Sequence, residues 1–229
     1  MYYPLMFDPG EDFAYGIGID WVGRVVEQVD GRTIDRFCRE EIFAPLDMTS
    51  TRFEPDDAVA PVKVRAATGH FHDGEFPGPP SRPEVYGIGS ALYSTAGDYI
   101  RFLRMILARG ELDGRRVLSG KTADLMLSNQ IGGIRVPAMT SGLPAISADV
   151  DVFSGIPKTW TAGFMRVEED VPGLRRAGSV GWAGILNTHC WLDGAQGIAG
   201  VFMTQQLPFC EPRSLAAFAE FERAVYAGC

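Results

Sequence analysis

Tyr15 is the residue whose type and position first point to chemistry. It stands in FDPGEDFAYGIGIDWVG, residues 7–23, between a Pro-Gly turn and an apolar run with helical spacing. A phenol has an ordinary pKa of about 10, but a neighbouring ammonium group and a helix N-terminus both favour its anion, which can then relay protons. The same position also suits a tyrosine that packs the start of the helix. The stretch by itself favours the packing interpretation.

Ser179 is a second residue that could do chemistry, as a nucleophile. It lies in AGSVG, residues 177–181, which comes close to the G-x-S-x-G elbow of α/β-hydrolases. An elbow needs a hydrophobic strand before the serine and a helix after it, whereas EEDVPGLRR precedes Ser179 and a Gly-rich, strand-like segment follows. A triad would also need a histidine after an acid, and His189 lies only ten residues on. An α/β-hydrolase-like esterase that uses Ser179 is therefore kept as an alternative.

The composition excludes several other classes of function. The 229 residues are 46% hydrophobic and 22% charged with a net charge of -8, which is typical of a globular protein and argues against a nucleic-acid binder. No apolar run approaches the roughly 20 residues of a membrane span. The N-terminus shows no signal peptide, so a cytoplasmic location is favoured.

The histidines and cysteines indicate no metal site. The four cysteines have the spacing of neither a zinc site nor a disulfide framework. His70 and His72 flank Phe71 in a Pro- and Gly-rich stretch, where a metal pair is conceivable but a solvated loop is favoured. We expect no metal and no cofactor.

The elements that must position these residues change in kind along the chain. Helical spacing and capping residues dominate the region of about 11–130, whereas short strand-like segments separated by turns occupy about 158–229 and end in an amphipathic helix. Residues 54–90 and 131–159 read as loops that would shape a substrate pocket. We expect a single α+β domain over residues 1–229, with helices packed on an antiparallel sheet. The expected helices span 17–30, 33–44, 94–110, 118–130 and 215–226, and the expected strands lie within 160–169, 174–180, 185–193 and 197–206.

Four stretches taken in order resemble the serine β-lactamase-like superfamily. They are FDPGEDFAYGIGIDWVGRVVEQVDG, EEIFAPLDMTSTRF, GIGSALYSTAGDYIRFLRMILARGELDGRRVLS and GSVGWAGILNTHCWLDGAQGIAGVFMTQQLPF. The P-G-x-x-x-x-Y-G element, the P-L-x-M-x-x-T element and the strand ending V-F-M-T-Q carry the resemblance, which covers the chain from about Leu5 onward. It is closest to the branch of class C β-lactamases, family VIII esterases and LovD-like acyltransferases, and implies a β-lactamase/transpeptidase-like fold.

The resemblance also implies a mechanism and a set of site residues. In the family a serine of an S-x-x-K motif attacks an acyl carbonyl, and its lysine and a tyrosine share the proton transfers. Tyr15 matches the catalytic tyrosine. Trp182, Ala183 and Gly184 match the W-x-G form of the K-T-G element, and the backbone N–H of Ile185 would be one of two oxyanion donors.

Two alternatives remain open at this strand. Ser179-Val180-Gly181 occupies the other possible register of the K-T-G element. Trp182 could instead fill the core at the start of a strand.

The sequence departs from the family in ways that bear on the substrate. Ile17 stands where β-lactamases carry asparagine, and the lysine of K-T-G is missing. Both departures favour an esterase or acyltransferase over a β-lactamase. The resemblance thus implies a small-molecule ester, amide or β-lactam-like substrate, while the composition argues against nucleic acid and a membrane span.

The S-x-x-K motif itself is absent from these 229 residues. In the family it lies upstream of the tyrosine, so we expect a C-terminal portion of the fold, incomplete at its N-terminal side and inactive alone. A truncated gene model and a degenerate, non-catalytic binding or scaffold module are the alternatives. A chain without the N-terminal strands would expose a sheet edge, which predicts an oligomer, a domain swap or aggregation.

Overall fold

The computed structural model describes residues 4–54, 65–66 and 83–228. Its strands β4 to β8 form an antiparallel sheet in the order β4-β5-β6-β7-β8, so each strand pairs with its neighbour in sequence. The predicted meander is therefore confirmed. The helices are α1 (Gly18–Asp30), α2 (Ile34–Cys38), the π-helical η1 (Arg39–Phe43), α3 (Ala96–Leu107), α4 (Gly120–Leu127) and α5 (Pro212–Ala227). The strands are β1 (Arg65–Ala66), β2 (Glu111–Leu112), β3 (Arg115–Arg116), β4 (Lys158–Trp160), β5 (Met165–Val167), β6 (Val180–Gly184), β7 (Thr188–Asp193), β8 (Ile198–Phe202) and β9 (Gln206–Leu207).

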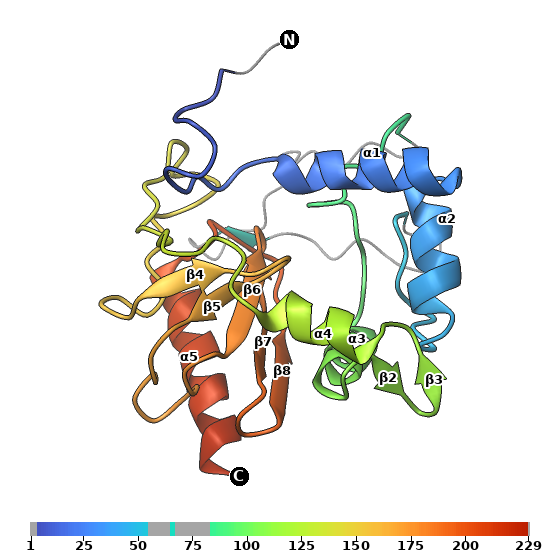
Figure 1. The fold of residues 1–229 in the computed structure, drawn as a ribbon. Coiled ribbons are helices and arrows are strands. Elements are labelled where there is room, and N and C mark those ends of the chain that lie inside the picture. Colours follow the sequence, from blue (N-terminus) through green and yellow to red (C-terminus); the bar gives the residue numbers. More distant parts are fainter. Residues whose placement is uncertain (1–3, 55–64, 67–82, 229) are drawn as a thin grey trace.

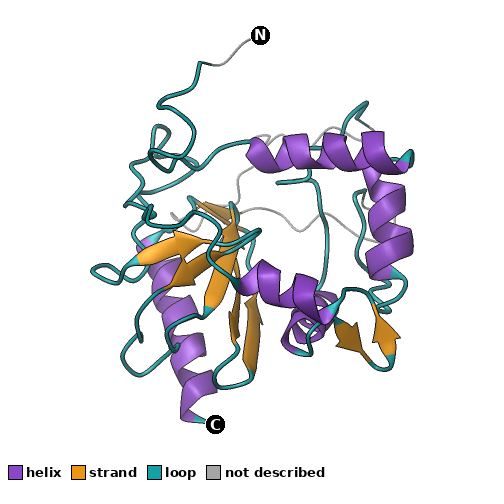
Figure 2. Ribbon diagram, viewed as in Figure 1, coloured by secondary structure: helices purple, strands orange, loops and turns teal. Residues whose placement is uncertain are grey.

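Helices cover both faces of this sheet, which gives the expected α+β architecture (Figure 1). The alternation of side chains along β7 separates two cores. Leu192 joins a cluster with Leu103 and Ile106 of α3, whereas Trp191 joins a cluster with Phe218 of α5. Figure 2 shows the strands β4 to β8 gathered beside α5, with α1 along the top of the view and α2 at the right.

Helix α5 is joined to the sheet side by a buried ion pair. The guanidinium of Arg175 donates to the carboxylate of Glu222, and their side chains are only 4% and 1% exposed. The same guanidinium lies over the rings of Phe153, Trp191 and Phe218, at 4.9, 5.4 and 5.9 Å from their centroids. This arrangement fixes α5 against the segment that leads into β6.

Local capping signals located several helices correctly. Gly31 ends α1 with φ of 85°, a left-handed conformation that glycine adopts without strain. The hydroxyls of Thr95 and Ser119 accept hydrogen bonds from the backbone N–H groups of Asp98 and Thr122, both at 3.1 Å, at the starts of α3 and α4. These bonds satisfy donors that the first turn of a helix leaves free.

The second helix begins differently from the prediction. Thr33 precedes α2 in extended conformation, but its side chain makes no capping hydrogen bond. Glu27 of α1 accepts from the backbone N–H of Ile34 at 2.9 Å instead, so the cap comes from the neighbouring helix. The predicted helix of residues 33–44 is divided into α2 and the π-helical η1.

Two strand boundaries were also misplaced. Residues 174–179 are irregular and β6 begins at Val180, although LRRAGSV was expected to form a strand. Ile185, Leu186 and Asn187 form the turn before β7, because Asn187 takes a positive φ of 58° that an extended strand cannot accommodate. Residues 131–157 are irregular as expected, but β4 begins at Lys158, inside the loop predicted for 131–159. Much of the predicted loop 54–90 lies outside the described residues, as do His70 and His72.

Helix α1 has apolar residues on two faces. One face packs inward, where Gly23 lies close to Ile88 and Val26 contacts the main core. The other face carries the α1 stripe, which we define as Trp21, Val22, Val25 and Val29, exposed to 67%, 51%, 60% and 83%. The solvent face of an isolated surface helix is normally polar, so this stripe is an unpartnered apolar surface among the described residues.

Candidate active site

The fold brings Tyr15 and Trp182 together across 167 positions of sequence. The indole Nε1–H of Trp182 donates to the phenol oxygen of Tyr15 at 3.1 Å, and the two ring centroids are 5.0 Å apart. Tyr15 comes from the loop before α1 and is 54% exposed, whereas Trp182 comes from β6. Two elements that the sequence singled out separately thus form one contact.

Two further aromatic residues complete this contact. Trp160, the last residue of β4, lies 4.7 Å from Trp182, and Phe13 lies 5.3 Å from Trp160, both between ring centroids. We call Phe13, Tyr15, Trp160 and Trp182 the aromatic cluster. Sequence reasoning missed Phe13 and Trp160, because their approach depends on the sheet register rather than on any local motif.

The register explains how β4 reaches β6 across the intervening strand. Trp160 pairs with Met165 of β5, and Met165 pairs with Gly181, the residue before Trp182. The two tryptophans therefore lie at the same end of the sheet. No local motif links Trp160 to the W-x-G element, so the sequence carried no signal for this contact.

The end of β6 extends beyond its neighbour β5. Strand β5 pairs with β6 only at Gly181 and Val180, whereas β7 pairs with β6 as far as Gly184. The backbone of residues 182–184 consequently has no strand partner on its β5 side among the described residues. Such an overhang offers backbone N–H and C=O groups to a bound carbonyl compound.

Ile185 follows the overhang as the first residue of the turn and is 38% exposed. Gly184 also has a structural reason to be glycine, because a Cβ there would meet Oγ1 of Thr188 at 2.5 Å. The turn is held by Asn187, whose amide donates to the carbonyls of Gln206 and Pro208 at 2.9 Å and accepts from the N–H of Cys210 at 2.9 Å. The turn that follows the overhang is therefore rigidly supported.

Ser179 lies in surroundings that do not suit a nucleophile elbow. It is buried, its hydroxyl donates to the carbonyl of Arg176 at 2.6 Å, and the chain continues into β6 rather than into a helix. His189 pairs with Ala183 while Leu192 pairs with Val180, so the histidine lies about 13 Å along the strands from the serine end. The structure does not bring Ser179 and His189 together.

His189 is placed in an apolar environment between the sheet and α5. Its ring stacks on Phe218 at 4.3 Å, and its Nε2 has no hydrogen-bond partner among the described residues. Burial, together with the charge of Arg175, lowers its pKa to about 4. The imidazole is therefore neutral and serves packing.

Lys158 is the lysine closest in sequence to the aromatic cluster, two residues before Trp160 on β4. Its buried ammonium donates to a carboxylate oxygen of Asp151 at 3.2 Å and to the carbonyls of Val152 and Phe153 at 2.9 and 3.3 Å. All three of its donors are used within the loop before β4. It anchors that loop rather than serving Tyr15.

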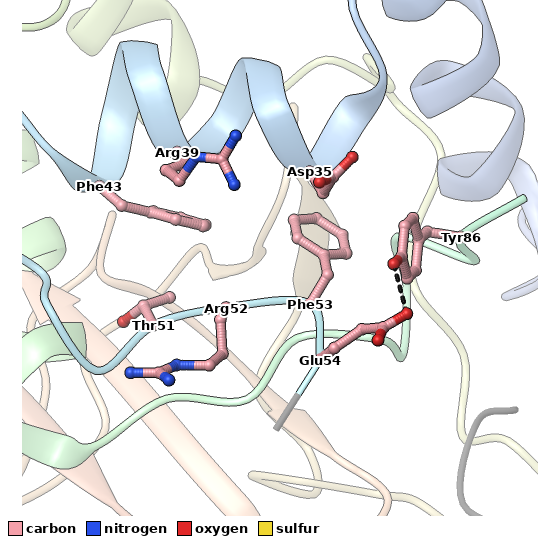
Figure 3. A pocket seen from close by; sticks show the side chains of 8 residues that line it. All are labelled: Asp35, Arg39, Phe43, Thr51, Arg52, Phe53, Glu54 and Tyr86. Atoms are coloured by element: carbon pink, nitrogen blue, oxygen red, sulfur yellow. Dashed lines mark hydrogen bonds between the residues drawn. The ribbon is translucent and has the colours of Figure 1, made fainter. Parts of the chain in front are cut away.

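A separate cavity of about 330 Å³ lies below α2 and η1 (Figure 3). The hydroxyl of Tyr86 donates to Glu54 there at 2.6 Å. The cavity shares no residue with the aromatic cluster. Its walls are formed by Asp35, Arg39, Phe43, Thr51, Arg52, Phe53, Glu54 and Tyr86.

Two negative findings concern the described residues only. They contain no group of three or more metal-ligating side chains that could hold an ion. None of their helices has the length and apolar character needed to cross a membrane.

Comparison with known proteins relates the chain to a family. The family model described as Beta-lactamase matches residues 2–224. The lovastatin esterase of Penicillium rubens is 30% identical over 217 residues, which are 87% of this chain and 52% of that protein. The monacolin J acid methylbutanoyltransferase of Aspergillus terreus is 27% identical over 98% of this chain and 56% of its own length.

Solved structures agree with this placement. Unliganded simvastatin synthase from Aspergillus terreus has a TM-score of 0.79 at 25% identity, over 99% of this chain and 58% of that chain. EstCE1, a hydrolase with promiscuous acyltransferase activity, has a TM-score of 0.66 at 20% identity and supports the fold alone. The chain spans about half the length of the curated relatives that it matches.

Proposed function

Because the chain belongs to the beta-lactamase family, we propose that it is the portion of a serine-type acyl hydrolase or acyltransferase that carries the proton-relay tyrosine and the carbonyl-binding edge. The reaction would pass through an acyl-serine intermediate. The observation that carries the proposal is the contact between Tyr15 and Trp182, which joins the two family elements at one end of the sheet.

Each site residue has a role in this proposal. Tyr15 exchanges a proton with the serine oxygen, together with the lysine of the S-x-x-K motif. Trp182, Ala183 and Gly184 line the edge that receives the acyl carbonyl, and the N–H of Ile185 donates to its oxygen. The overhang of β6 beyond β5 supports this role, since it leaves the backbone accessible on one side.

The serine and lysine must come from a segment outside these 229 residues, since the sequence contains no S-x-x-K. We therefore propose that this chain alone is inactive. An ester is the favoured substrate, because Ile17 and Trp182 replace the asparagine and lysine of the β-lactamase motifs. The named activities of the relatives, an esterase and an acyltransferase, point in the same direction.

The second candidate function is a non-catalytic binding module that retains the site as a surface. The absence of S-x-x-K is the observation that favours it. The two functions differ in what an added nucleophile segment would do.

Hydrolysis of p-nitrophenyl esters tests the choice. We expect no turnover by the 229-residue chain, and turnover by a version extended upstream to include S-x-x-K that is abolished by Tyr15→Phe. An extended protein inactive on every ester and β-lactam tried would leave the binding module. Turnover by the short chain that Ser179→Ala abolishes would establish the hydrolase-like alternative.

A further inference from the structure

The loop that carries Tyr15 has few attachments to the rest of the protein. Within the described part of the chain, residues 4–16 make two local hydrogen bonds, from the N–H of Glu11 to Asp8 and from the N–H of Phe13 to Asp12. Among the described residues, the hydrogen bond from Trp182 to Tyr15 is the one that joins this loop to another element. The position of the Tyr15 ring must therefore be set by its contacts within the aromatic cluster.

The cluster holds the loop from two directions. Trp160 contacts both aromatic residues of the loop, Phe13 at 5.3 Å and Tyr15 at 5.8 Å. Trp182 contacts Tyr15 at 5.0 Å and Trp160 at 4.7 Å. Tilted and edge-on ring pairs at these distances each add specific stabilisation beyond the area that they bury.

The hydrogen bond also fixes the direction in which the phenol can act. An indole N–H is a donor only, whereas a phenol has one proton and accepts through its lone pairs. Since Trp182 donates to one lone pair, the proton and the remaining lone pair of Tyr15 are left for another partner. A reacting partner must therefore use the phenol proton or the lone pair that Trp182 leaves unoccupied.

We propose that Trp182 and Trp160 are positioning residues for Tyr15, with Trp182 orienting the phenol oxygen through its indole N–H and Trp160 bracing the loop. In this arrangement the side chain of Trp182 orients the relay while its backbone belongs to the carbonyl-binding edge. The catalytic consequence rests on the proposed function, but the contact itself does not.

The chain has four tryptophans, so its indole N–H signals can be followed individually by ¹H–¹⁵N NMR. The Trp182 signal is identified by its loss in Trp182→Phe. In Tyr15→Phe, which keeps the ring and removes the acceptor oxygen, we expect this signal to shift. We also expect its exchange with water to become roughly two- to tenfold faster, the equivalent of one net hydrogen bond.

Two other tryptophans provide the controls. Trp191 is fully buried and its unchanged signal shows that the variant is folded, whereas Trp21 is 67% exposed and sets the rate for an unprotected indole. In Trp160→Phe we expect faster exchange at Trp182 as well, since the loop loses its brace. A Trp182 signal that is unaffected by Tyr15→Phe, or that exchanges as fast as Trp21 in the unmodified chain, would overturn the proposal.

Activity measurements separate this inference from the proposed function. In the extended protein with an S-x-x-K segment, Trp182→Phe should lower kcat with little change in KM, because the ring and the backbone edge remain. A higher KM with unchanged kcat would refute a positioning role while leaving the esterase function intact. A confirmed NMR contact in an inactive extended protein would refute the function and leave the contact.

Discussion

Replacing Glu222 with glutamine should destabilise the chain far more than the same exchange at a surface position of α5. The carboxylate of Glu222 and the guanidinium of Arg175 are almost fully buried, so neither charge is solvated by water. Two unit charges about 4 Å apart attract by about 4 kcal/mol at an effective dielectric constant of 20. Glutamine removes that attraction and leaves the cation uncompensated among three aromatic rings.

Breaking a buried pair in this way costs about 3–5 kcal/mol, a large fraction of the roughly 5–15 kcal/mol that stabilises a typical protein. For a chain of this length that corresponds to a fall in Tm of roughly 6–20 °C. Urea denaturation followed by circular dichroism and by tryptophan fluorescence, to which Trp191 at 5.4 Å from the guanidinium contributes, would measure the free energy of unfolding.

The matched control is Glu220→Gln on the same helix, whose partner Arg223 is solvent-exposed. Such a surface pair contributes at most about 1 kcal/mol, so the control should change little. A double variant, Arg175→Met with Glu222→Leu, should cost less than Glu222→Gln because no charge is left buried. A loss below about 1 kcal/mol for Glu222→Gln, or a double variant as unstable as the sum of its singles, would refute the reasoning.

Three further perturbations have defined outcomes. Because the pKa of His189 is about 4 in the folded chain and 6.5 ordinarily, the unfolded chain takes up the proton first, and stability is lost as pH falls from about 6.5 to about 4. His189→Phe should remove up to about 3 kcal/mol of that loss. An acid denaturation curve unchanged by the substitution would contradict this. Gly200→Ala should destabilise by about 1–3 kcal/mol in a thermal melt, since its Cβ would lie 2.0 Å from the ring of Trp191; a wild-type Tm would show that the strands can shift apart. If the α1 stripe drives self-association, Val25→Lys should lower the mass measured by light scattering toward that of the monomer. Leu143→Lys, at an equally exposed apolar site, should leave the mass unchanged. A monomeric unmodified chain would exclude the association.

The features that the sequence predicted best are those that depend on neighbouring residues. Gly31 and Thr95 mark helix ends because a glycine cap or a hydroxyl cap acts within a few residues. The alternation of short apolar segments and turns likewise located the meander. These signals need no knowledge of the rest of the fold.

The remaining features depend on contacts between distant residues. Trp160 joins the candidate site only through the pairing of three strands, which no local pattern encodes. Ile185 and Leu186 looked like the start of a strand because they are apolar, but Asn187 turns the chain there through hydrogen bonds to residues 206–210. Tyr15 and Trp182 were predicted one at a time, whereas their hydrogen bond required the folded chain.

Asn187 is held by several hydrogen bonds, whereas the Tyr15 loop has few attachments, and this difference matters for protein engineering. The turn that presents Ile185 is held by three hydrogen bonds to the segment before α5, so substitutions that remove them would lower the stability of the fold. The loop of residues 4–16 can instead be varied in length and composition with little cost to the sheet, provided that Phe13 and Tyr15 keep their tryptophan partners. Libraries designed to test the proposed acyl-transfer function should therefore randomise this loop and leave the 185–187 turn untouched.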